Sequence, residues 1–178
     1  CEVISGGMIT GDRIGPIGEV AAYISSAYKD VEQRAGVNFG EAFLKETLEE
    51  GSAIFTSIPA AIAMSIFKEQ KPNDQLEFAA AIQKAIYYHG FKPADPNTFV
   101  QLAQDYGYNA TDFAQKMEDQ EYAKKAEADF QLSAQLQVSG FPTVFLVDRS
   151  KAAIVTRGFT DYDHLEKQFK AAQDALKD

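Results

Sequence analysis

The sequence is poor in cysteine, because its 178 residues include only one, Cys1. A single thiol cannot form a disulfide within the chain, so the fold has to be stabilised by packing rather than by crosslinks. It also leaves the cellular compartment open, with the cytoplasm slightly favoured over the periplasm. The length suits one domain, or one domain with a large insertion, and the 46% of hydrophobic residues can form a real core.

Basic residues are outnumbered as well, with 17 Lys and Arg against 26 Asp and Glu, which gives a formal net charge of -9. Phosphate binding requires clustered Lys and Arg, so this balance argues against nucleic acid as a partner. It argues equally against an anionic membrane surface. The longest apolar region, residues 58–64, is far shorter than the roughly 18 residues of a transmembrane helix. We therefore expect neither nucleic acid nor a membrane among the partners.

The sequence also lacks the spacing of a metal site, so no metal is expected. Its glycine-rich segment, residues 6–11, lacks the Lys-Ser/Thr ending of a phosphate-binding loop. That segment is interpreted either as a plain loop or as part of an active-site rim. His89 and His164 lie near the ends of predicted helices and are interpreted as structural or surface residues.

The sequence does contain a long region in which apolar residues recur at helical spacing, followed by short apolar runs typical of strands. Between residues 17 and 137, apolar residues recur at helical spacing and are interrupted by Gly, Pro and capping residues. The predicted helices begin near residues 17, 43, 57, 74, 95, 109 and 119. Short strands are predicted at residues 2–5, 141–147 and 152–156, the last two as a hairpin, before a final helix over residues 161–176.

The segment Ser139-Gly-Phe-Pro-Thr143 is the most specific motif in the chain. Pro142 cannot donate a ladder hydrogen bond, so it marks the first residue of the following strand or a bulge. Only X-Pro bonds adopt the cis form readily, and we expect Phe141–Pro142 to be cis, with a trans proline at an edge strand as the alternative. A long helix, this motif, a hairpin and a terminal helix together match the C-terminal half of a thioredoxin fold.

The ordered set of motifs resembles the DsbA-like thioredoxin-domain family, which includes bacterial members. Residues 137–146 resemble its cis-proline segment, and residues 3–8 resemble its second strand with the loop that follows. Residues 57–60 and the stretch from Phe78 to Gly107 resemble its inserted helical domain. The resemblance implies an α/β, thioredoxin-like fold with a large all-helical insertion. We expect a discontinuous thioredoxin-like domain at residues 1–14 and 119–178, and the helical domain at residues 15–118.

The resemblance also places the catalytic cysteines outside this sequence. The family's first strand and first helix, with Cys-X-X-Cys at the helix start, should precede Cys1, because a helix N-terminus stabilises the thiolate. Cys1 does not begin such a motif, since position 4 is Ile4. No catalytic residue is therefore expected within the chain. The substrate-binding residues implied by the resemblance are Gly140, Phe141, Pro142, Thr143, Gly6, Gly7 and Met8.

The activity implied by the resemblance is thiol–disulfide exchange with a protein or small-molecule substrate. No cofactor is expected, although glutathione could serve as a co-substrate, and the oligomeric state is open. Two alternatives remain: a glutathione-dependent isomerase or transferase with Ser at the helix start, and a redox-inactive binding module. The roughly 30 residues upstream of Cys1 would distinguish the three.

Two structural expectations follow from the implied fold. Residues 2–5 should form a parallel strand that ends at the same sheet edge as Gly140 and Phe141, bringing Gly7 close to Pro142. The first strand, upstream of Cys1, should lie between that strand and residues 143–147. Without it, several buried backbone groups would be unpaired at about 1–3 kcal/mol each, so residues 1–178 are not expected to fold alone.

Overall fold

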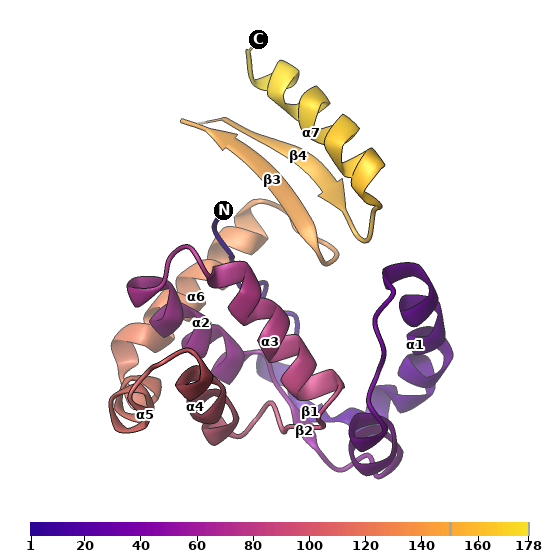
Figure 1. Ribbon diagram of the computed structural model, residues 1–178, viewed down its shortest axis with the longest axis vertical. Coiled ribbons are helices and arrows are strands. Elements are labelled where there is room, and N and C mark those ends of the chain that lie inside the picture. Colours follow the sequence, from indigo (N-terminus) through magenta and orange to yellow (C-terminus); the bar gives the residue numbers. More distant parts are fainter. Residues whose placement is uncertain (150, 178) are drawn as a thin grey trace. The chain divides into compact units, whose positions relative to one another are not determined.

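The computed structural model describes residues 1–149 and 151–177, and its chain divides into two compact units, Cys1–Ala134 and Gln135–Asp178. The first unit is mainly helical (Figure 1). Its main helices are α1 (Ala21–Ala35), α2 (Ile58–Gln70), α3 (Gln75–Tyr87), α4 (Pro96–Asp105), α5 (Ala110–Glu118) and α6 (Gln120–Gln135). Shorter elements are the 3-10 helices η1 (Gly11–Arg13) and η2 (Ile17–Val20), the π-helix η3 (Ala42–Glu49), and the paired strands β1 (Gly15–Pro16) and β2 (Ile54–Phe55).

Side-chain caps explain where two of these helices begin. Asp95 accepts a hydrogen bond from the Asn97 amide at 2.9 Å before α4, and Asn109 accepts one from the Asp112 amide at 3.0 Å before α5. Ser57 precedes α2 in the same way, but its side chain does not cap the helix. Its hydroxyl oxygen instead accepts from the Ile9 amide at 3.0 Å, so it holds a distant loop.

The core of the first unit is built around α2, which packs against α3, α4 and α5. Phe67 of α2 stacks on Phe78 of α3 with ring centroids 4.0 Å apart, and both side chains are fully buried. The rings of Tyr106 and Tyr108 pack against the ring of Phe67, with centroid distances of 5.3 Å and 5.4 Å. Each buried aromatic side chain contributes about 1.5–3 kcal/mol, so this cluster is a major source of stability.

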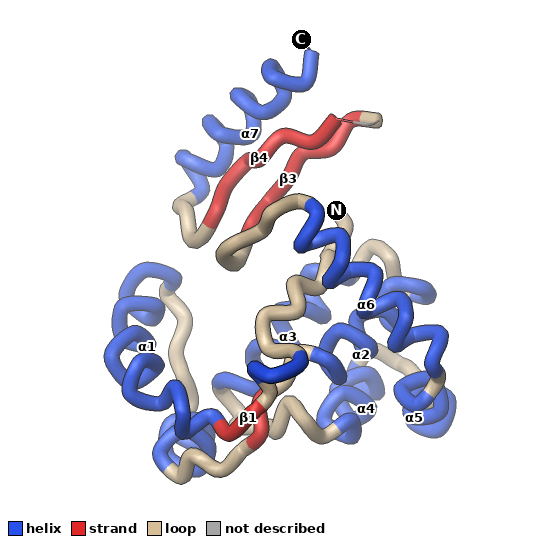
Figure 2. The backbone as a smooth tube through the Cα atoms, turned by 180° about the vertical axis from the view of Figure 1, so that it is seen from behind, coloured by secondary structure: helices blue, strands red, loops and turns tan. Residues whose placement is uncertain are grey.

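The second unit is a hairpin covered by one helix (Figure 2). Strands β3 (Thr143–Asp148) and β4 (Lys151–Arg157) pair antiparallel, with a register shift between Val144 and Phe145. Helix α7 (Tyr162–Lys177) packs on the hairpin and buries Ala172. This unit confirms the predicted order of hairpin and terminal helix.

The predicted strand at residues 2–5 is wrong. These residues, all of which the structure describes, form no strand, because side chains rather than a neighbouring strand bind their backbone. The Val3 amide donates to Gln75 Oε1 at 2.9 Å, and the Ser5 amide donates to Asp129 Oδ2 at 3.0 Å. The Val3 carbonyl accepts from Lys68 Nζ at 2.7 Å. The predicted domain boundaries, at residues 14/15 and 118/119, stay a prediction.

Candidate functional site

The first part of the candidate site is the loop of residues 140–143, which leads into β3. Its Phe141–Pro142 peptide bond is cis, as predicted. The Gly158 amide donates to the Pro142 carbonyl at 2.7 Å, and the Thr143 hydroxyl donates to the Gly140 carbonyl at 2.7 Å. These two bonds fix the loop on both sides of the proline.

Phe141 is the residue of this loop that remains open to a ligand. Its side chain is 42% exposed, although it is large and apolar. Within the described residues of the second unit, no hydrogen bond engages its backbone N–H or carbonyl. An extended chain could therefore pair with this backbone, as strands do at an open edge, while the phenyl ring contacts its side chains.

The second part of the candidate site is the loop of Gly6, Gly7 and Met8 in the first unit. Gly7 has a φ of 64°, in the left-handed region that favours glycine. A Cβ atom at Gly7 would lie 2.7 Å from Cγ of Phe130 on α6, so the position also lacks room for a side chain. The loop thus needs glycine for two separate reasons.

The carbonyl of Gly7 is held from the other side by two side chains. Thr10 Oγ1 donates to it at 3.4 Å, and Arg13 Nη2 donates at 3.3 Å. Met8 follows with 52% of its side chain exposed, so a flexible apolar group stands at the surface. The support of this loop by Thr10, Arg13 and Phe130 was not predicted, because no spacing rule identifies these side-chain contacts.

Cys1 and His164, which the sequence also singled out, lie outside the two loops. Cys1 is exposed. Asp161, before α7, accepts from the His164 amide at 2.9 Å and contacts its Nδ1 at 2.7 Å. These hydrogen bonds, the amide bond first, lower the pKa of the Asp161 carboxyl and explain His164 as part of a helix start. The loops at Gly7 and Pro142 belong to different compact units, and their proximity stays a prediction.

Among residues 1–149 and 151–177, no group of three or more His, Cys, Asp and Glu is arranged to hold a metal ion. No helix described there has both the length and the apolar character needed to cross a bilayer.

Comparisons with solved structures reveal close similarity of fold. A candidate protein disulfide isomerase from Nitrosomonas europaea superposes with a TM-score of 0.82 at 25% identity, over 96% of this chain and 79% of that one. The cytosolic disulfide reductase DsbM from Pseudomonas aeruginosa gives a TM-score of 0.73 at 23% identity, over 97% and 82%. A second DsbM structure, with GSH, gives a TM-score of 0.69 at 22% identity, over 97% of this chain and 82% of that one.

A search of curated proteins finds no match at a significant level. The family model of the DSBA-like thioredoxin domain, in contrast, matches residues 23–170, which is most of the chain. The predicted fold class is therefore confirmed: it is mixed α/β and thioredoxin-like, mostly helical with small sheets. The predicted resemblance is confirmed with it, and the chain belongs to the DSBA-like thioredoxin domain family.

Proposed function

We propose that the protein is a thiol–disulfide oxidoreductase whose cysteine motif lies upstream of Cys1 and whose substrate binds at residues 140–143. The observation that carries this proposal is family membership over residues 23–170 together with the open Gly-Phe-Pro-Thr loop at the start of β3. One structural relative is a disulfide reductase and another a candidate disulfide isomerase, which supports the same class of reaction.

The reaction proceeds in two exchanges. A cysteine thiolate attacks one sulfur of the substrate disulfide, the substrate S–S bond breaks, and the other sulfur leaves and takes up a proton. The second cysteine then attacks the mixed disulfide. The two cysteines of the enzyme end as a disulfide and the substrate ends as two thiols. The reverse sequence oxidises a dithiol substrate.

Within the chain, the residues of the two loops bind and orient the substrate. The backbone of Phe141 pairs with the chain on either side of the reacting cysteine, and its ring excludes water from the sulfur atoms. Gly6, Gly7 and Met8 are proposed as further substrate-binding residues, and the exposed Met8 side chain adapts to different apolar groups.

Glutathione is the proposed thiol co-substrate. One structure similar to this chain is DsbM with GSH, which favours a small thiol that returns the enzyme to its reduced form. The same observation keeps a glutathione-dependent isomerase or transferase as the second candidate. A redox-inactive binding module is the third, and it would bind the extended chain without exchange.

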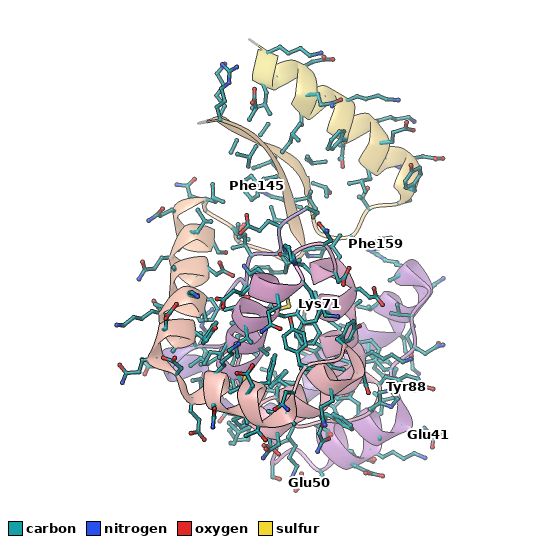
Figure 3. The ribbon with its side chains drawn as sticks, turned by 60° about the vertical axis from the view of Figure 1, so that its left-hand side comes forward. Glu41, Glu50, Lys71, Tyr88, Phe145 and Phe159 are labelled. Carbon is teal, nitrogen blue, oxygen red and sulfur yellow. The ribbon has the colours of Figure 1, made fainter. Side chains whose placement is uncertain are left out.

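The test is a reduction assay with the full-length protein, a peptide disulfide as substrate and glutathione as reductant. Phe141→Ala should raise KM about fivefold, since losing about 1 kcal/mol of apolar contact changes affinity by that factor. Phe159→Ala is the matched control, because Phe159 is also exposed in the second unit but follows β4 (Figure 3). Absence of thiol–disulfide exchange in the wild-type protein would refute the proposal.

A further inference from the structure

We infer that Lys68 and Asp129 are positioning residues, which fix the loop of Gly6, Gly7 and Met8 by holding the backbone of residues 3–5. This inference rests on the proposed function, in which that loop binds the substrate. Lys68 belongs to α2 and Asp129 to α6, so neither residue is near the loop in sequence.

The contacts of the pair form a short chain of hydrogen bonds. Lys68 Nζ donates to the Val3 carbonyl at 2.7 Å and to Asp129 Oδ2 at 2.9 Å. The same Asp129 oxygen accepts from the Ser5 amide at 3.0 Å. Gln75 completes the set, because its Oε1 accepts from the Val3 amide at 2.9 Å. Three side chains thus occupy the backbone positions that a neighbouring strand would use.

Burial distinguishes this pair from the other ion pairs in the described residues. The side chains of Lys68 and Asp129 are 16% and 13% exposed. Most of the other pairs join neighbours on one helix and are largely exposed, such as Lys170 and Glu166 on α7. Exposed pairs contribute little, whereas removing one member of a buried pair leaves the other charge unpaired.

Helix α6 connects the pair to the loop. Asp129 binds Ser5, and the next residue, Phe130, lies against Gly7 with no room for a Cβ atom between them. Asp129 and Phe130, which are adjacent on α6, therefore contact two positions of the segment, Ser5 and Gly7. If Asp129 lost its hold on Ser5, Gly6 and Gly7 would be free to move off Phe130, and the exposed Met8 would move with them.

The experiment compares Lys68→Met and Asp129→Leu with Lys170→Met in the full-length protein. Methionine retains much of the apolar stem of Lys68 but cannot donate to Val3 or Asp129. In both variants, hydrogen–deuterium exchange over residues 2–9 should rise at least about tenfold, as expected for loss of a hydrogen bond to a charged group. KM for the peptide disulfide should rise severalfold with kcat unchanged, and Lys170→Met should alter neither quantity.

A double variant separates positioning from stability. Lys68→Met with Asp129→Leu replaces the pair by apolar side chains and should recover stability, since such replacements are often neutral or stabilising. It restores none of the bonds to Val3 and Ser5, so the raised KM should persist. Recovery of KM together with stability would overturn the inference.

The remaining outcomes distinguish this inference from the proposed function. Unchanged hydrogen–deuterium exchange over residues 2–9 in both single variants would overturn the positioning role, and the proposed enzymatic activity would be unaffected by that result. Faster exchange with an unchanged KM would overturn the link to the substrate. A wild-type protein without thiol–disulfide exchange would refute the proposed function. The hydrogen–deuterium exchange measurement would still test whether Asp129 holds the Ser5 amide.

Discussion

Replacing Gly7 by alanine should destabilise the protein more than any effect of backbone conformation alone can explain. At a φ of 64°, alanine costs roughly 1–2 kcal/mol relative to glycine, because its Cβ meets the following carbonyl. The same Cβ would lie 2.7 Å from Cγ and 2.8 Å from Cδ1 of Phe130. Forcing an extra methyl group into a packed site costs about 1–3 kcal/mol more. The expected loss is therefore roughly 2–5 kcal/mol in the free energy of unfolding.

Gly11→Ala is the matched control, because Gly11 has a similar φ of 57° but nothing within 4 Å of its Cβ position. In urea unfolding of the full-length protein, the free energy of unfolding of Gly7→Ala should be about 1–3 kcal/mol lower than that of Gly11→Ala. Adding Phe130→Ala to each glycine variant should remove most of this difference, since both contacts with the ring disappear and only the Cβ of residue 130, 3.2 Å away, remains. Equal losses for the two single variants would refute the steric argument.

Three further substitutions test the first unit, each by urea unfolding. Phe67→Ala should cost about 3–5 kcal/mol, because it leaves a cavity opposite the stacked ring of Phe78. Tyr108→Phe removes the hydrogen bond from the Tyr108 hydroxyl to the Phe67 carbonyl, 3.0 Å long, and should cost about 0.5–1.5 kcal/mol, because that carbonyl still accepts from the Lys71 amide. Burial raises the pKa of Tyr108 to about 12, so wild-type stability should fall as the pH rises from about 10 to 12, and less steeply in this variant. Asn109→Ala should cost about 1 kcal/mol through loss of the cap on the Asp112 amide.

The helices could be predicted because their signals are local. Asp95 and Asn109 stand where capping residues precede apolar residues at helical spacing, and both cap as expected. The hairpin was equally readable, since the apolar run after Pro142 is too short for a helix and a turn follows it. The small pair β1–β2 was missed, because two-residue strands carry no periodicity.

The candidate site was only partly readable. The motif around Pro142 identified one loop because proline and glycine restrict the backbone locally. The other loop was recognised by its glycines, but the reason for Gly7 lies 123 positions away, at Phe130. Contacts between side chains so distant in sequence depend on how α6 packs, which no spacing rule encodes.

The wrong strand at residues 2–5 shows how a correct local pattern can have an unexpected partner. The segment is tied to α2 at two points: Val3 binds Lys68 near the end of the helix, and Ile9 exchanges two hydrogen bonds with Ser57 just before it begins. Eleven helical residues rise about 16 Å, and six steps of extended chain reach at most roughly 20 Å. The segment therefore runs antiparallel to α2 with little slack, as its β-branched residues favour, but polar side chains take the place of a strand. A hydroxyl, an ammonium, a carboxylate and an amide each bind one backbone group here, so the hydrogen bonds that a strand would supply as a ladder come from four separate side chains.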